Sequence, residues 1–322
     1  RSQRLSMSAE EKVVTEKDLT QDGEITLFEG KPFSGVRIGY HEKDIIKHKG
    51  HYKDGKLDGT WTQWDSMGNK ELEEIYKDGK TDGVIRSWWS NGNIQTEARW
   101  KNGEPINCTN WYENGQKMDE QNYKNGGPEG LNISWYDNGQ KEFEGVCKNG
   151  SPDGLFIYRY KNGLKKSEQY YKDGKLEGQL INWEEDGQKE LERNYKDGEL
   201  DGLLIWWYLN EQWWDKNQKK QSEETYKNGI KDGISTEWYE NGNKKKEEYY
   251  ENGEVVLLTK RNYMGNKESE ENYKDGKLDG LSTVWYENGN KKTEEVFKDG
   301  ELVEVTYKRG VFENFWKSIV GR

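Results

Sequence analysis

The stretch Tyr273–Gly280 reads YKDGKLDG, and near copies of it recur along the chain at a nearly constant interval. The second glycine of the motif stands at positions 59, 83, 130, 154, 178, 202, 233 and 280, so the usual step is 24 residues (83 − 59). A fixed period of this length is typical of repeat proteins, in which each unit is stabilised by its neighbours. The repeat therefore decides the architecture before any single residue is considered.

A second turn signal lies about midway between successive copies of this motif. It reads Asn-Gly in most repeats, as at Asn114-Gly115 and Asn288-Gly289, and Asp-Gly at Asp186-Gly187. Asn, Asp and Gly tolerate the positive φ angles that a type I′ hairpin turn requires. The segments between the turns are short and rich in Trp, Tyr, Thr, Ile and Val, which favours strands. Each repeat is therefore predicted to form one β-hairpin.

These patterns predict an all-β fold, an elongated antiparallel meander of about twelve tandem β-hairpin repeats across residues 25–310. Residues 1–24 form an N-terminal lead-in segment. Residues 311–322 form a short C-terminal capping helix, because apolar residues at 311, 312, 315, 316, 319 and 320 follow helical spacing. Docking of a partner by this helix is the alternative to capping.

Composition and charge exclude several classes of function. The net charge of −11 argues against nucleic acid as a partner, because a phosphate backbone requires a basic face. No segment is long and apolar enough to be predicted as a transmembrane helix. Hydrophobic content is only 30%, but 15 Trp and 20 Tyr can stabilise a thin sheet by stacking across strands.

The sequence shows no catalytic or cofactor-binding pattern. There is no phosphate-binding glycine loop, nucleophile motif or zinc motif, so we expect no enzymatic activity, no cofactor and no metal. Strand counting separates Cys108 from Cys147 by two strands, which is too far for a disulfide, and both are predicted to be free thiols.

Two columns of residues recur at fixed positions in every repeat. With two-residue turns, Trp285 faces Lys292 and Glu294 faces Thr283, so all four lie on one face of the sheet. The Glu column comprises Glu73, Glu97, Glu120, Glu144, Glu168, Glu192, Glu223, Glu247, Glu270 and Glu294. The Trp column comprises Trp64, Trp88, Trp111, Trp135, Trp183, Trp214, Trp238 and Trp285, with Arg159 and Arg261 at the other two positions.

The two columns have two interpretations. In the first, each Glu accepts hydrogen bonds from a nearby Thr, Lys or backbone N–H, and the Trp rings form the packing core. In the second, the face is a groove of aromatic platforms with acidic neighbours, which suits a sugar or a basic peptide. The second interpretation makes the Trp and Glu columns binding residues.

The repeat at residues 202–232 is seven residues longer than its neighbours (31 − 24). It brings Trp206, Trp207, Trp213 and Trp214 close together. Long loops with aromatic residues often carry binding in repeat proteins. The alternative is a longer hairpin whose tryptophans only pack on neighbouring strands.

The repeats GTWTQWDSMGNKELEEIYKDGKTD and GLSTVWYENGNKKTEEVFKDGELV closely resemble MORN-variant repeats of bacterial YwqK-type, antitoxin-like proteins. The resemblance covers about residues 25–310. It implies a non-enzymatic hairpin array that contacts proteins and sometimes lipids, and an exported rather than a cytoplasmic protein. A weaker likeness to choline- and glucan-binding cell-wall repeats rests on their short aromatic hairpins.

Three functions follow from the sequence. The first is a scaffold that binds a protein partner through the Trp/Glu-lined face and the 202–232 insertion. The second is carbohydrate or cell-envelope binding through exposed tryptophans. The third is a structural subunit of a filament or envelope assembly.

Overall fold

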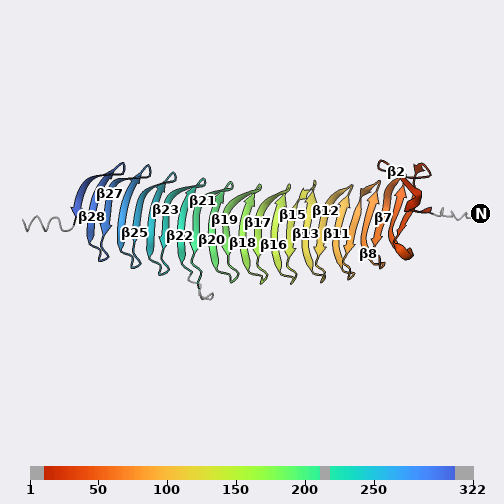
Figure 1. The fold of residues 1–322 in the computed structure, drawn as a ribbon, viewed down its shortest axis with the longest axis horizontal. Coiled ribbons are helices and arrows are strands. Elements are labelled where there is room, and N and C mark those ends of the chain that lie inside the picture. Colours follow the sequence, from red (N-terminus) through yellow and green to blue (C-terminus); the bar gives the residue numbers. More distant parts are fainter. Residues whose placement is uncertain (1–10, 211–217, 309–322) are drawn as a thin grey trace, which may run out of the picture. The chain divides into compact units, whose positions relative to one another are not determined.

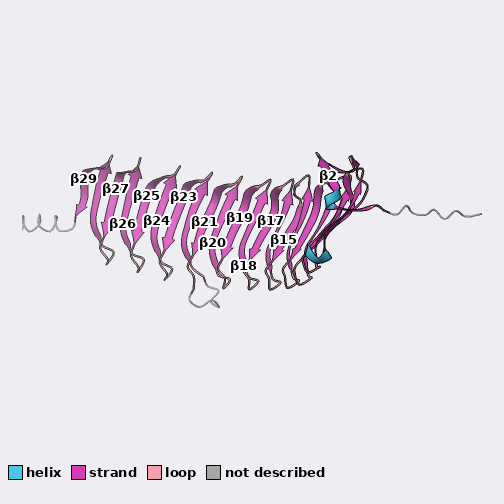
Figure 2. Cartoon of the chain, turned by 45° about the vertical axis from the view of Figure 1, so that its right-hand side comes forward, coloured by secondary structure: helices cyan, strands magenta, loops and turns pink. Residues whose placement is uncertain are grey.

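The computed structural model describes residues 11–210 and 218–308. Two compact units make up the chain, Arg1–Asp153 and Gly154–Arg322. Strands dominate both units, and the described residues contain only two helical segments, each a single 3₁₀ turn. These are η1 (Glu16–Asp18) and η2 (Glu42–Asp44), drawn in cyan near β2 in Figure 2. The predicted all-β hairpin meander is confirmed.

In the first unit, the strands from β5 onward follow one another in chain order as an antiparallel meander (Figure 1). Its strands are β1 (Val13–Thr15), β2 (Leu19–Asp22), β3 (Ile25–Phe28), β4 (Lys31–Pro32), β5 (Gly35–Tyr40), β6 (Ile46–Lys53), β7 (Lys56–Trp64), β8 (Lys70–Lys77), β9 (Lys80–Thr81), β10 (Gly83–Trp88), β11 (Ile94–Lys101), β12 (Glu104–Trp111), β13 (Lys117–Lys124), β14 (Gly127–Pro128), β15 (Gly130–Trp135) and β16 (Lys141–Lys148).

The second unit repeats the same antiparallel pairing, and each of its described strands pairs with the next one along the chain. Its strands are β17 (Ser151–Arg159, which begins in the first unit), β18 (Lys165–Lys172), β19 (Lys175–Trp183), β20 (Lys189–Lys196), β21 (Glu199–Trp207), β22 (Lys220–Lys227), β23 (Ile230–Trp238), β24 (Lys244–Glu251), β25 (Glu254–Arg261), β26 (Lys267–Lys274), β27 (Lys277–Trp285), β28 (Lys291–Lys298) and β29 (Glu301–Lys308).

The Asp-Gly turn of the YKDG motif is a two-residue hairpin, as predicted. Lys274 pairs with Lys277, and the two residues between them, Asp275 and Gly276, have φ angles of 48° and 71°. Positive φ at both central positions defines the type I′ turn, which explains why these sites are Asp or Asn followed by Gly. The backbone therefore fixes the motif, and no ligand is needed to explain it.

The second turn differs from the predicted two-residue hairpin. Gly289 N–H donates to Tyr286 O and Tyr286 N–H donates to Asn290 O, so the chain makes a wider loop in which only the glycine has positive φ. This is a three-residue loop with a bulge. The register shifts by one residue, and Trp285 pairs with Lys291 rather than with Lys292. The predicted pairing of Thr283 with Glu294 is confirmed, because the shift lies outside it.

Both sets of turns are tied to the next repeat by hydrogen bonds. At one edge, Gly300 N–H donates to Leu278 O at 2.9 Å. At the other edge, Asn241 Nδ2 donates to Tyr263 O at 2.8 Å, and Tyr239 Oη donates to Arg261 O at 3.0 Å. The Tyr and Asn of the WYENG motif therefore join adjacent hairpins. These bonds matter because a single hairpin is only marginally stable in water.

The N-terminal end of the first unit departs from the repeat pattern. A turn at Glu29-Gly30 joins β3 to β4 in a separate three-stranded sheet. β1 pairs in parallel with β5 and covers that edge of the meander. Phe33, only 2% exposed, packs with Val14 and Tyr52 in a small hydrophobic core. This end of the sheet is thus protected, as sheet edges generally need to be.

The predicted capping helix at residues 311–322 lies outside the described residues, as do Trp213 and Trp214. Within the described residues, no helix has the length and apolar character needed to cross a membrane. Cys108 and Cys147 are free thiols, each half-buried, and burial raises the pKa of both.

Candidate binding face

The Trp and Glu columns lie on one face of the strands, here called the tryptophan face. Each Trp ends a strand and each Glu lies in the middle of the following one. Thr283 is almost fully buried and pairs with Glu270 on one side and Glu294 on the other, so it lies between successive members of the Glu column. The described column residues are Trp64, Trp88, Trp111, Trp135, Trp183, Trp207, Trp238 and Trp285, with Glu73, Glu97, Glu120, Glu144, Glu168, Glu192, Glu223, Glu247, Glu270 and Glu294.

In the long repeat, the column position belongs to Trp207 and not to Trp214. Trp207 ends β21 and pairs with Lys220, as Trp238 pairs with Lys244 in the next repeat. Counting back from Gly233 gave Trp214 because the extra residues lie after the strand, between Trp207 and Lys220. Trp206, the neighbour of Trp207, points to the opposite face.

A column of lysines, which the sequence analysis did not identify, completes this face. Each lysine stands three residues before the column Glu and forms an ion pair with it, as Lys189 Nζ does with Glu192 Oε1 at 2.8 Å. The other pairs are Lys70–Glu73, Lys117–Glu120, Lys141–Glu144, Lys165–Glu168, Lys220–Glu223, Lys244–Glu247, Lys267–Glu270 and Lys291–Glu294. The recurring K-x-x-E spacing was the signal in the sequence.

The same lysines lie over the Trp ring of the following repeat. Lys267 Nζ lies 5.4 Å from the ring centre of Trp285, within the range of a cation–π interaction. Equivalent contacts join Lys70 to Trp88, Lys117 to Trp135, Lys165 to Trp183, and Lys189 to Trp207. The carboxylates of this face and five of its column rings therefore already have cationic partners from within the chain, and a basic ligand would have to displace these partners.

An exposed column of apolar residues lies on the same face, beside the Lys, Glu and Trp columns. In the second unit, Leu281 is two residues from Thr283 along β27, and both point to the tryptophan face. Leu281 is 42% exposed and Ile234 is 58% exposed. Other exposed members of the second unit are Leu155, Tyr170, Leu203 and Tyr249, and those of the first unit are Ile75, Leu131 and Val146. Repeated exposure of large apolar side chains on one face indicates an interaction surface.

The opposite face carries internal pairs between tyrosine and carboxylate. Tyr273 Oη donates to Glu271 Oε2 at 2.6 Å, and Tyr250 Oη donates to Glu248 Oε2 at 3.1 Å. Burial, and then the adjacent glutamate, raises the pKa of Tyr273 to about 12. Burial and the charge of Glu248 raise the pKa of Tyr250 to about 12 as well. Each of these pairs lies within a single strand, so its hydroxyl and carboxylate groups already have partners in their own repeat.

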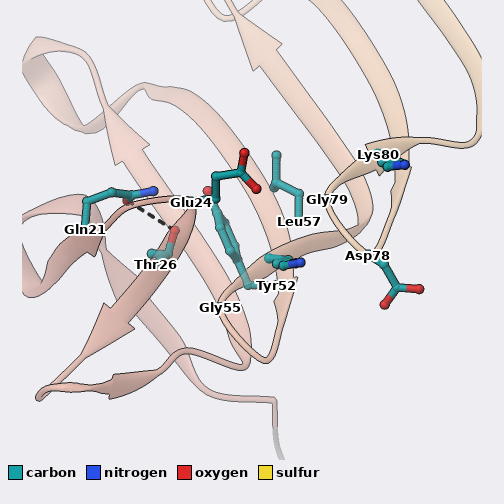
Figure 3. A pocket seen from close by; sticks show the side chains of 10 residues that line it. Gln21, Glu24, Thr26, Tyr52, Gly55, Leu57, Asp78, Gly79 and Lys80 are labelled. Carbon is teal, nitrogen blue, oxygen red and sulfur yellow. Dashed lines mark hydrogen bonds between the residues drawn. The ribbon is translucent and has the colours of Figure 1, made fainter. Parts of the chain in front are cut away.

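A depression of about 490 Å³ lies at the N-terminal end of the first unit (Figure 3). It is formed where the small sheet stands beside the turns at Gly55 and Gly79. Thr26 Oγ1 donates to Gln21 Oε1 at 3.3 Å along one wall. The lining also includes Glu24, Tyr52, Lys56, Leu57, Asp78 and Lys80. Its two lysines and two carboxylates give it no net charge, so it favours neither anions nor cations.

Comparison with known proteins identifies the repeat type. The model of the MORN repeat variant matches residues 81–102, 107–125, 231–252 and 278–299. These four segments are similar to MORN-variant repeats. Most of the other hairpins between β5 and β29 share their two turns and their strand positions within the described residues. The narrower likeness to YwqK-type antitoxins stays a prediction.

Other comparisons add little. The crystal structures titled TcdB2-TccC3-Cdc42 and TcdB2-TccC3 are 11% and 10% identical to this chain, each with a TM-score of 0.16. Each match covers 82% of this chain but only 17% and 19% of those chains, so this chain spans less than a fifth of their length. No curated protein matches the chain.

Proposed function

We propose that this chain is a non-enzymatic scaffold that binds a protein partner through the tryptophan face. The observation that carries the proposal is the exposed apolar column, which includes Leu203, Ile234 and Leu281. Large apolar side chains that recur on one face of successive hairpins suit an extended protein surface. MORN-type repeats as a class bind proteins or membranes, which agrees with this function.

The charges of the face favour an apolar contact with a polar rim. Lys244 and Glu247 neutralise each other, and so do Lys267 and Glu270. Surface ion pairs of this kind contribute little by themselves to affinity, but they set the alignment of a partner. The partner is therefore expected to present apolar side chains at a spacing that matches the spacing of the repeats.

The test is co-purification of the partner from cells that naturally make the protein. The Leu203→Lys/Leu281→Lys variant should lose the partner that the wild-type chain retains. Ser282→Lys is the matched control, since Ser282 adjoins Leu281 in β27 but lies on the opposite face. The proposal fails if the Ser282 variant loses the partner and the double variant keeps it, or if the face only joins two copies of this chain.

A further inference from the structure

In the long repeat, the residue that directly precedes the column Trp in its strand is aromatic. In most repeats it holds a polar or small residue, for example Asn110, Ser134 or Asn182, whereas the long repeat has Trp206. Tyr158 is the other aromatic residue at this position. Trp206 is 38% exposed and lies on the face opposite to the tryptophan face. The exposed ring and the inserted loop are two departures from the repeat, and they occur at the same place.

A pocket of about 400 Å³ surrounds Trp206, a volume within the range of small-ligand sites. Trp206 and Tyr208 supply its aromatic side chains, while Trp238, whose ring belongs to the tryptophan face, lies beside it with its backbone oxygen. Tyr208 is fixed, because its Oη donates to Trp238 O at 2.8 Å. The polar lining consists of Gln221, Ser222, Glu224, Glu237 and Lys245.

The carboxylates of the pocket already have cationic or hydroxyl partners. Glu224 accepts a hydrogen bond from Tyr226 Oη at 2.7 Å and lies 3.0 Å from Lys231 Nζ. Glu237 lies 3.6 Å from Lys245 Nζ and 3.3 Å from Lys246 Nζ. A cation entering the pocket would have to compete with these lysines, so the pocket does not favour a charged ligand.

The remaining polar groups are uncharged. Gln221 and Ser222 line the pocket and bring an amide and a hydroxyl group to it. Aromatic rings that stack on apolar C–H surfaces, beside amide and hydroxyl groups that pair with hydroxyls, match the two surfaces of a sugar ring. We infer that this pocket binds a neutral saccharide, independently of the protein partner of the opposite face.

The test is isothermal titration calorimetry of the full chain with neutral tetrasaccharides, namely cellotetraose, maltotetraose and the tetramer of N-acetylglucosamine. Choline and tetralysine serve as cationic probes. We expect one of the neutral tetrasaccharides to bind and both cations to give no heat. Trp206→Asn should weaken this binding at least about tenfold. Its fold should persist, because Asn182 occupies the same strand position in the preceding repeat.

Tyr158→Asn is the matched control, since it removes the other aromatic residue at this strand position but lies outside the pocket. It should leave the affinity unchanged. Absence of binding by all three tetrasaccharides would overturn the inference. So would equal binding by wild type and Trp206→Asn with matching circular dichroism, or binding of a cation that Trp206→Asn abolishes. None of these results bears on the tryptophan face.

Discussion

Lys267 lies over the ring of Trp285 in the next repeat, with Nζ 5.4 Å from the ring centre, while its ammonium group also pairs with Glu270 in its own strand. One side chain thus contributes to the hairpin that contains it and to the contact between hairpins. Since the same arrangement recurs along both units, it is a main element of the repeat interface.

Lys267→Ala should lower the free energy of unfolding by roughly 1 kcal/mol, because it removes an ion pair and a cation–π contact together. Lys292→Ala is the control, since Lys292 lies 5.8 Å from the ring centre of Tyr286 and forms no ion pair within residues 11–210 and 218–308. Urea unfolding of both variants at low and high salt provides the measurement. If Lys292→Ala lowers the free energy of unfolding as much as Lys267→Ala does, the Lys–Glu and Lys–Trp contacts do not stabilise the repeats.

Asn241→Ala should destabilise the protein by about 1 to 2 kcal/mol, because Asn241 makes two hydrogen bonds. Its Oδ1 accepts from Asn243 N–H at 2.9 Å, and its Nδ2 donates to Tyr263 O in the next repeat. Asn241→Asp keeps the acceptor oxygen and removes only the Nδ2 donor, so it should have about half the effect of Asn241→Ala in thermal unfolding. No loss of stability in Asn241→Asp would contradict the role of Asn241 in joining repeats.

Tyr250 should ionise near pH 12 in the folded protein, as followed by tyrosinate absorbance, because burial and Glu248 raise its pKa. A raised phenol pKa stabilises the fold at pH values below about 10, and this stabilisation is lost as the pH rises toward the folded value. Glu248→Gln should move the ionisation to lower pH. Glu251→Gln, at the end of the same strand, should not move it. A similar shift in both variants would rule out the pairing of Tyr250 with Glu248.

Glu247 should contribute to stability above acidic pH and lose that contribution as pH falls. Burial alone would raise its pKa, but Lys244 and Arg261 together hold the pKa below its usual value. A lowered carboxyl pKa gives stability that is present above the unfolded pKa of about 4.3 and is lost on protonation. Glu247→Gln should flatten the acid limb of the stability profile, whereas the exposed control Glu254→Gln should leave it steep.

Much of the fold could be predicted from the sequence because the residues at the turns indicate where each hairpin reverses direction. The Asp-Gly pair at Asp275-Gly276 requires positive φ at both residues, and that requirement fixed the hairpin register at this edge. The Asn-Gly pair at Asn288-Gly289 admits a wider loop as well, and local sequence alone does not distinguish the two. For that reason the predicted partner of Thr283 was correct, whereas the predicted partner of Trp285 was wrong by one residue.

The candidate site was predicted only in part. Identical positions in successive repeats placed the Trp and Glu columns on one face, but the count through the insertion assigned Trp214 where Trp207 stands. The exposure of Leu281 and Ile234 depends on how the strands pack. The alternation of residues along a strand therefore did not predict that these side chains form an exposed surface. The Trp206 pocket is lined by residues of four successive strands, β21 to β24, so no single repeat encodes it.

Site-specific photo-crosslinking tests the central claim most directly. A photoreactive amino acid is placed at Leu281, on the tryptophan face, or at its neighbour Ser282, on the opposite face, in cells that naturally make the protein. The account predicts that position 281 forms a covalent adduct with one defined protein and that position 282 does not. An adduct with that protein from position 282 alone, or no adduct from either position, would contradict it.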